Sequence, residues 1–455
     1  MISFARKQFV NSGTLLKRAV KLPSFNILFS QSAVMVILII ADVVYARMFS
    51  TEMFGTWKQL ALLINLVIPL MSLGIPEGFK YYAALDRNNI TVHLGRVLAL
   101  LALVFVIVFF LFSFGAVNLI ARLLNNAGII HFKYMVPILF LVISVNQIFR
   151  NLMINNQQTG ILLNSAVVIL IAGVFLIFLN IYSYHFFSEN VLWVLLSLMF
   201  VVLFSIPSIM YLVKERDILQ DIRAADFTGN YSNYFKIGFP IFVATFIGVI
   251  GANLDKALVS SLTDVKQFAV YSVGAFEIPF FSMISASVSQ SIFPRLVQLY
   301  NDKSVKDAKE LWLKTTLRVT YITYPIILFL MIFAKPLIVL IFTDKYVDGV
   351  FIFKTFLLIG LWRNGYYGGL ISASGRTKWI TLYSAISLIS NIAFSFLMYK
   401  VMGIYGIAYG ALMATVIVAT LQLVHERLLG GWFRTIILNR TVLVLLILIL
   451  IFYFI

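Results

Sequence analysis

A few ionisable side chains interrupt long apolar runs of this sequence, and they are the first candidates for chemistry. Arg363 lies about 13 residues into the run 350–372, and Glu277 lies about nine residues into the run 268–290. If these runs cross a membrane, a charge at the centre costs about 2.5–3.5 kcal/mol on the mildest insertion scale, so it normally faces a cavity or a partner. Arg363 can then bind phosphate or sugar groups, and Glu277 can take up a proton or a sodium ion. Alternatively, the two side chains form a buried structural pair between neighbouring helices.

Two aspartates lie near the ends of other apolar runs. Asp42 is close to the end of the run 26–46, and Asp255 is similarly placed in the run 235–259. Each carboxylate can bind a coupling ion, H⁺ or Na⁺, or it can simply reach the polar interface from the end of a helix. Lys256 directly follows Asp255 and places a base beside it. Both aspartates therefore have a functional and a structural interpretation.

Further charged and polar residues lie near the ends of apolar runs. Glu77 and Lys80 are three residues apart, so they share one helix face and can pair with each other. Lys80 can instead bind an anion at the mouth of a cavity. Arg295 is a second mouth candidate, with an ordinary interfacial anchor as the alternative. Beside Arg363, three side chains can offer hydrogen bonds to hydroxyl groups: Asn364, Tyr366 and Tyr367.

The composition shows what kind of elements must position these residues. Of 455 residues, 61% are hydrophobic and 12% are charged, whereas about 25% are charged in an average soluble domain. The chain is therefore predicted to be an all-α, polytopic membrane protein. The net charge of +17 is explained by basic cytoplasmic loops, so we expect no nucleic-acid partner.

Motifs for catalysis, nucleotides and metals are missing from the sequence. There is no cysteine, which excludes disulfides, thiol catalysis and thiolate metal sites. There is no Gly-x4-Gly-Lys-[Ser/Thr] loop and no His-Glu-x2-His motif, and the four histidines are dispersed. We therefore expect neither a catalytic residue nor a cofactor. ATP cannot drive this chain unaided, which leaves an ion gradient, the membrane potential or substrate supply.

Twelve membrane spans are predicted from the apolar runs. With the N-terminus inside, 24 of the 35 Lys and Arg residues fall on inner segments, Arg150 among them, as the positive-inside rule requires. The ninth run is too long for one span, so we expect Lys335-Pro336 to end it and residues 336–343 to turn back along the interface. The spans are predicted near 26–46, 57–79, 96–118, 132–153, 161–182, 191–213, 235–259, 268–290, 312–342, 350–372, 379–399 and 404–424.

The order of the motifs indicates an internal duplication. Asp42 is followed by Phe54-Gly-Thr-Trp57, and 213 residues after Asp42, Asp255 is followed by Phe268-Ala-Val-Tyr271. The polar segment 214–231 comes after six spans, so both halves begin on the cytoplasmic side and are related by an axis along the membrane normal. The predicted domains are a basic amphipathic arm on anionic lipids (1–25), two six-helix bundles (26–213 and 232–425), the linker (214–231) and a tail (426–455).

The tail is the one region whose topology stays open at this stage. Thr441–Ile455 adds 15 apolar residues after Arg440, which is short for a span of about 20 residues. The segment can cross the membrane or remain on one side of it.

Several of these motifs together resemble a known family. The helix with Asp42, the Phe54-Gly-Thr-Trp57 entry, Leu73-Gly-Ile-Pro-Glu-Gly78 and Ile371-Ser-Ala-Ser-Gly-Arg-Thr-Lys378 are similar to bacterial polysaccharide flippases. These are the Wzx-type lipid-linked oligosaccharide translocases of the multidrug/oligosaccharidyl-lipid/polysaccharide exporter superfamily. The resemblance covers roughly residues 20–425.

The resemblance implies a fold, a location and a substrate. It implies a V-shaped pair of six-helix bundles around a central cavity, in the bacterial inner membrane. The substrate would be an undecaprenyl-pyrophosphate-linked oligosaccharide, and polysaccharide polymerase and glycosyltransferases would be its functional partners. Arg363, Asn364, Tyr366, Tyr367, Lys80, Arg295 and Lys256 are then candidates for substrate binding, and Glu277, Asp42, Asp255 and Glu77 are candidates for ion coupling.

Two other functions remain open. A multidrug or organic-cation exporter of the same superfamily would need acids in its cavity where a diphosphate flippase needs bases. Acids and bases in the predicted spans balance by count, so only side-chain directions can separate the two. The third alternative is a membrane scaffold that transports nothing.

Overall fold

The computed structural model describes residues 23–215, 217–218, 231–276, 279–363, 365, 367–376 and 378–455, and these are helical with no strand among them. The predicted all-α membrane fold is confirmed. The basic arm predicted for 1–25 and the linker 214–231 lie almost entirely outside the described residues, as do Glu277, Asn364 and Tyr366. The predicted V shape and central cavity stay predictions.

The chain divides into two compact units. Two short segments of the first half of the sequence, Ser50–Leu62 and Leu123–Asn126, belong to the second unit. Unit 1 comprises residues up to Phe49, Leu63–Arg122 and Ala127–Phe246, and unit 2 comprises Ser50–Leu62, Leu123–Asn126 and Ile247–Ile455. The helices α3 (Thr51–Ser72) and α11 (Ser232–Leu262) therefore each contribute to both units. Asp255 lies on the part of α11 that belongs to unit 2.

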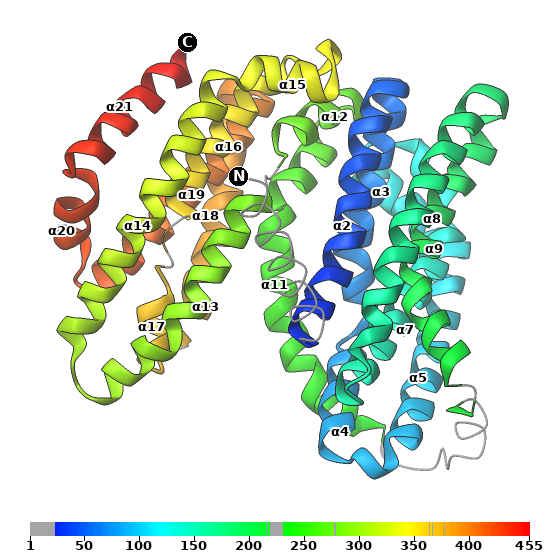
Figure 1. Ribbon diagram of the computed structural model, residues 1–455. Helices are drawn as coiled ribbons and strands as arrows, with labels where there is room; N and C mark the ends of the chain where they lie inside the picture. The colour runs from blue at the N-terminus through cyan, green and yellow to red at the C-terminus, as the bar shows by residue number, and fades with distance from the viewer. Residues whose placement is uncertain are drawn as a thin grey trace, which may run out of the picture. The chain divides into compact units, whose positions relative to one another are not determined.

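The remaining elements of unit 1 form one bundle (Figure 1). In both views α2 lies beside α8, and α9 lies beside α7 and α8. The elements are α2 (Pro23–Met48), α4 (Ile75–Leu85), η1 (Arg87–Asn89), α5 (Ile90–Leu111), η2 (Phe112–Ala116), α6 (Val117–Leu123), η3 (Ala127–Phe132), α7 (Met135–Asn155), α8 (Thr159–Phe186) and α9 (Glu189–Lys214).

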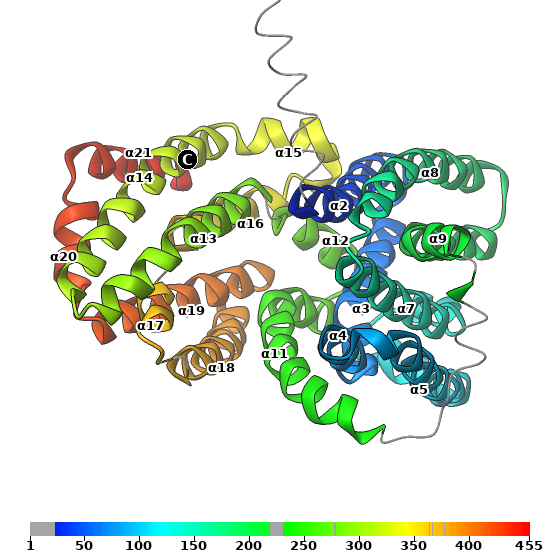
Figure 2. The ribbon, with the colours of Figure 1, turned by 60° about the horizontal axis from the view of Figure 1, so that its bottom comes forward.

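Unit 2 holds the elements of the second half and the tail. Figure 2 shows α18 beside α19 and α21 beside α14, in agreement with their packing. The elements are α12 (Val265–Gly274), α13 (Pro279–Asn301), α14 (Val305–Ile332), α15 (Ala334–Phe342), η4 (Asp344–Tyr346), α16 (Gly349–Arg363), α17 (Gly369–Ala373), α18 (Lys378–Met402), α19 (Ile404–His425), α20 (Leu429–Trp432), η5 (Phe433–Ile437) and α21 (Arg440–Phe454).

Within the described residues, each predicted span falls mainly on helix, but not every one is a single long helix. Among the described residues, ten helices are long and apolar enough to cross a membrane, and the bent pair formed by α20–η5 and α21 makes an eleventh candidate. The predicted span 57–79 is divided between α3 and α4, the span 268–290 between α12 and α13, and the span 350–372 between α16 and α17. Breaks of this kind are tolerated at membrane depth where the backbone is covered by protein or lines a cavity.

The ninth span ends slightly before the predicted position. α14 ends at Ile332 and α15 begins at Ala334, so the break precedes Lys335-Pro336. Pro336 falls in the first turn of α15, where its missing N–H group would have had no helical acceptor. The proline therefore starts the short helix instead of terminating the long one.

The two units share a packing order along the chain. In unit 1, α4 packs on α5, α5 on α7, and α7 and α8 on α9. In unit 2, α13 packs on α14, α14 on α16, and α16 and α18 on α19. This order is consistent with the predicted duplication, and the superposition of the two halves stays a prediction.

A close backbone contact fixes the beginning of α11 on unit 1. Gly74, at φ 78°, separates α3 from α4, and a Cβ on Gly238 of α11 would collide with the Gly74 carbonyl oxygen. A Cβ on Gly78 would likewise collide with the carbonyl oxygen of Tyr234. Only glycine permits this approach, which holds the first part of α11 against α4.

The tail reaches the end of unit 2 where α16 and α19 begin. Lys354 Nζ of α16 donates to the carbonyl oxygen of Phe452 at 2.8 Å, and the Tyr453 hydroxyl donates to that of Tyr409 of α19 at 2.6 Å. α19 ends at His425, so α20, η5 and α21 together return along the length of the bundle, with a bend of 82° before α21. The tail is thus a candidate for a broken membrane span or for a re-entrant loop.

We expect a reporter fused after Ile455 to lie on the opposite side of the membrane from one fused after Arg427, because α21 carries the chain back to the other end of unit 2. Alkaline phosphatase and green fluorescent protein fusions at both positions measure this directly. If the two fusions report the same side, the tail does not cross.

Candidate functional site

A small intramembrane pocket in unit 2 brings three predicted site residues together. Asp255 and Lys256 come from α11, and Arg363 comes from the last turn of α16. The other lining residues are Gly251, Ala252, Phe356, Ser387, Asn391, Ala411, Ala414 and Thr415. Arg363 lies more than 100 residues after Asp255 and Lys256 in the sequence, and the fold places all three around one cavity.

Asp255 is the buried acid of this pocket. It is 5% exposed, and the hydroxyl of Tyr271 on α12 donates to its Oδ2 atom at 3.1 Å. A buried carboxylate is costly unless hydrogen bonds or opposite charges compensate it. Lys256 and Arg363 supply that positive charge from the pocket wall. The arrangement can hold a charged carboxylate inside the membrane.

The volume of this pocket limits what it can hold. It is about 40 Å³, and a single water needs roughly 10–15 Å³ by the same measure. The pocket therefore has room for a few waters or one small cation, and no room for a sugar ring. Within the described part of the chain, no cluster of three or more His, Cys, Asp or Glu side chains forms a metal site.

Other predicted site residues of unit 2 lie elsewhere. The Tyr367 ring packs against Trp312 of α14, with 5.7 Å between ring centroids, and does not line the pocket. Arg295 is exposed on α13 and donates to Gln298 Oε1 at 3.2 Å, one helical turn away. Glu277, which the sequence offered as an alternative structural partner of Arg363, lies outside the described residues, so this pairing stays a prediction. Among the described residues, Asp255 is the acid that shares a pocket with this arginine.

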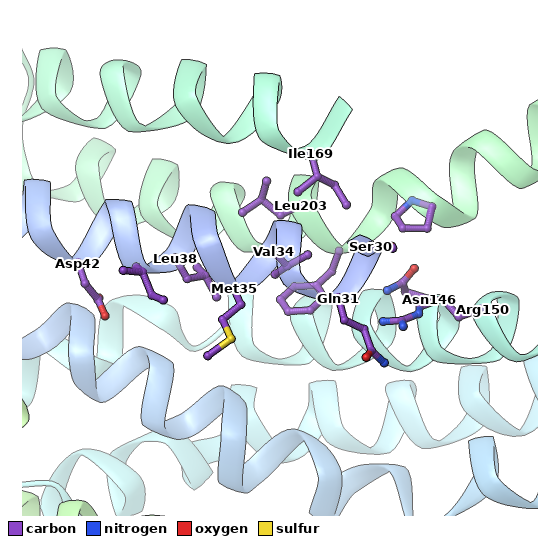
Figure 3. A pocket seen from close by; sticks show the side chains of 13 residues that line it. Ser30, Gln31, Val34, Met35, Leu38, Asp42, Asn146, Arg150, Ile169 and Leu203 are labelled. Carbon is purple, nitrogen blue, oxygen red and sulfur yellow. The ribbon is translucent and has the colours of Figure 1, made fainter. Parts of the chain in front are cut away.

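A larger pocket lies in unit 1, and Figure 3 shows it from close by. It is formed by α2, α7, α8 and α9 and has a volume of about 310 Å³. Asp42 lies at one end, and Gln31, Asn146 and Arg150 lie together at the other. Apolar side chains fill the wall between them: Val34, Met35, Leu38, Ile39, Ile169, Leu203 and Phe204.

Asp42 and the polar end of this pocket are well separated. Gln31 and Asp42 are 11 residues apart on α2, which corresponds to roughly 16 Å along a helix axis. The carboxylate therefore does not neutralise the guanidinium of Arg150 across the pocket. The pocket presents an acid at one end and a donor cluster at the other.

Glu77 and Lys80, both on α4, do not form the pair that their spacing allowed. Glu77 Oε1 accepts a hydrogen bond from Gln147 Nε2 of α7 at 2.9 Å, while Lys80 is exposed. Among the ion pairs of the residues that the structure describes, none joins Glu77 to Lys80. The i, i+3 spacing allowed Glu77 to pair with Lys80 on its own helix, but its carboxylate accepts from Gln147 on the neighbouring helix α7 instead.

Sequence reasoning missed the polar end of the unit 1 pocket. Arg150 was counted among the charges of the inner segments, because it lies near the end of the predicted span 132–153. A usable signal existed: Arg363 follows Arg150 by 213 residues, the same spacing that separates Asp255 from Asp42. At this spacing each of the two predicted halves carries one aspartate and one arginine.

Comparisons with known proteins agree on the kind of protein. A family model of polysaccharide biosynthesis proteins matches residues 44–350. A Shigella flexneri protein named "Putative O-antigen transporter" is 25% identical over 311 residues, which cover 66% of this chain and 70% of that protein.

Solved structures show the same fold. The lipid II flippase MurJ in an inward closed conformation has a TM-score of 0.64 at 15% identity, covering 94% of this chain and 97% of the flippase. An inward-facing multidrug resistance MATE family transporter of the MOP superfamily has a TM-score of 0.63 at 14% identity, covering 88% and 97%.

Proposed function

Since the chain belongs to the polysaccharide biosynthesis protein family, we propose that it is a flippase for lipid-linked oligosaccharides. This membership confirms the family resemblance found in the sequence. The substrate is a repeat unit on undecaprenyl pyrophosphate, carried by alternating access from the inner to the outer leaflet of the bacterial inner membrane. Glycosyltransferases supply that substrate, and a polymerase consumes it.

The observation that carries this proposal is the arginine in each intramembrane pocket. Arg150 lines the pocket of unit 1 and Arg363 lines that of unit 2. The unit 2 cavity itself is too small for a diphosphate, so Arg363 would meet one with the exposed side of its side chain. A diphosphate needs cationic donors along its path, and guanidinium groups bind phosphate oxygens with two parallel hydrogen bonds. Similarity to a lipid II flippase and to a protein named as an O-antigen transporter supports the same substrate class.

An organic-cation exporter is the second candidate, and the pocket charges disfavour it. The two pockets are lined by the acids Asp42 and Asp255 and by the bases Arg150, Lys256 and Arg363. A site that selects cations needs an excess of acids, because the local potential concentrates the ions of opposite charge. Among the described residues that line the two pockets, bases outnumber acids by three to two, which supports an anionic substrate.

The unit 2 pocket is the proposed site of ion coupling. Its volume fits H⁺ or Na⁺ with a few waters, and Asp255 supplies the one buried carboxylate among its lining residues. Binding of the ion would weaken the attraction between Asp255 and the neighbouring bases Lys256 and Arg363. The conformational equilibrium can then respond to the ion gradient.

Deletion of the gene in its own host provides the test. We expect lipid-linked repeat units to accumulate and surface polysaccharide to disappear, as measured by labelling of cell-surface glycan and by extraction of the lipid-linked pool. Expression of the intact chain should restore the surface glycan. Unchanged surface glycan together with higher sensitivity to cationic drugs would favour the exporter instead.

A further inference from the structure

Arg150 presents an uncompensated charge to the unit 1 pocket. Its side chain is half-buried and lines the cavity from α7. Within the part of the chain that the structure describes, no hydrogen bond or ion pair satisfies this guanidinium. Such a charge is costly at membrane depth and is retained where it binds a ligand or a partner. The acid of the same pocket, Asp42, lies at its far end (Figure 3).

Two neutral donors accompany the guanidinium. The Oδ1 atom of Asn146 accepts a hydrogen bond from the Ser208 hydroxyl at 3.3 Å, which leaves the amide group of Asn146 as a donor at the pocket wall. Gln31 of α2 lies next to Arg150 in the close view. A guanidinium with two side-chain amides is a donor set for an oxyanion.

We propose that the polar end of the unit 1 pocket, made of Arg150, Gln31 and Asn146, binds a phosphate-type anion. The proposal rests on the proposed function for one source of that anion, the diphosphate of the lipid-linked substrate. The headgroup of an anionic membrane lipid is the other source. Both carry a phosphate group next to a hydrocarbon chain, and both fit the same chemistry.

The shape of the pocket agrees with such a ligand. Its volume of about 310 Å³ is at the small end of the range for small-molecule sites, which is about 300–1,000 Å³. A diphosphate fits at the donor cluster, and the apolar wall of Val34, Met35 and Leu38 can cover the first part of a lipid chain. A whole oligosaccharide does not fit, so its sugars would lie outside this pocket.

The duplication gives independent support for a pocket role of Arg150. The spacing of 213 residues relates Arg150 to Arg363 and Asp42 to Asp255, and all four side chains line a pocket of their own unit. The four positions therefore behave as two copies of one acid–base arrangement.

The test is binding of farnesyl diphosphate to the purified full-length protein in detergent, measured by calorimetry. A hydrogen bond to a charged group is worth about 1.5–3 kcal/mol, so Arg150→Gln should weaken binding about ten- to hundredfold. Arg150→Lys should retain part of the affinity, because the charge stays and the planar fork is lost. Arg122→Gln, at an exposed arginine of α6 in unit 1, is the matched control and should bind as the wild type does.

Competition with phosphatidylglycerol separates the two sources. If only farnesyl diphosphate requires Arg150, the anion is that of the substrate; if phosphatidylglycerol requires it and displaces farnesyl diphosphate, the anion is that of a membrane lipid. Equal affinities of Arg150→Gln and the wild type for both probes would overturn the proposal. That result would leave the flippase function standing, since transport by the wild type is measured separately.

Stability without ligand distinguishes a binding role from a structural one. Removal of an unpaired, half-buried charge should leave the thermal midpoint of Arg150→Gln at or above that of the wild type, because the cost of desolvation is gone. A lower midpoint in the absence of any probe would assign Arg150 a structural role and refute the anion site.

Discussion

Arg363→Ala is expected to abolish export of surface polysaccharide while the protein still folds in the membrane. Arg363 lines the unit 2 pocket together with Asp255 and Lys256. Its side chain is exposed at the edge of this pocket, its guanidinium stays charged at any physiological pH, and its planar fork suits phosphate. Arg363→Lys should therefore rescue export only partly. Surface glycan labelling and the amount of protein in the membrane are the two measurements.

A double substitution separates substrate binding from ion pairing. If Arg363 served only to neutralise Asp255, Arg363→Ala with Asp255→Asn would recover much of the lost export, because no unpaired buried charge would remain. We expect the double variant to stay as inactive as Arg363→Ala. The same result is expected with Glu277→Gln, at the acid that the sequence suggested as partner. Near-normal surface glycan from either double variant would make the structural pair the better account.

Asp255→Asn is expected to remove the dependence of transport on the ion gradient and to reduce export at least tenfold. The Asn side chain keeps an oxygen that can accept from the Tyr271 hydroxyl, so the local packing should survive. What is lost is the carboxylate that can bind and release H⁺ or Na⁺ in the pocket. A tenfold reduction in export corresponds to a loss of about 1.4 kcal/mol of coupling free energy between the ion and transport.

A matched control and an ion titration complete this second test. Asp302→Asn changes an exposed aspartate in the turn after α13 and should leave transport unchanged. Transport should be followed while the H⁺ and Na⁺ gradients are imposed one at a time. If Asp255→Asn still responds to the gradient as the wild type does, the coupling ion binds elsewhere.

The sequence predicted the fold well because one strong physical signal governs it. Apolar runs long enough to cross a bilayer can satisfy their backbone hydrogen bonds only as helices, so the positions of the spans followed directly. The internal breaks were harder to place. The ninth span ended before Pro336, since a proline is as suitable for starting α15 as for ending α14.

The candidate site was only partly predictable. Asp255 and Arg363 stood out because a charge inside an apolar run is rare, and the fold brought them to one pocket. The Tyr367 ring contacts Trp312 because of how the helices pack, and the spacing of residues along the sequence does not predict this packing. Likewise, the partner of Glu77 is Gln147, which is 70 residues away along the chain.

Arg150 escaped attention for a different reason. The positive-inside rule explains any arginine near the cytoplasmic end of a span. Because that explanation was sufficient for Arg150, no functional role was considered for it. Comparison of the two predicted halves would have shown that Arg150 and Arg363 share the 213-residue spacing of Asp42 and Asp255. For Arg150, the positive-inside rule indicates a cytoplasmic anchor, whereas the 213-residue spacing indicates a pocket residue like Arg363.

Reconstitution of the purified protein in liposomes tests the central claim most directly. The vesicles carry undecaprenyl-pyrophosphate-linked oligosaccharide with a fluorescent sugar, and a membrane-impermeant glycosidase added outside reports the fraction in the outer leaflet. Pre-digestion removes the outer pool, and its replenishment from the inner leaflet measures translocation. We predict that the wild-type protein restores the cleavable pool within the assay, while Arg363→Ala and protein-free liposomes do not. Equal rates of replenishment with the wild type, with Arg363→Ala and without protein would contradict the flippase account.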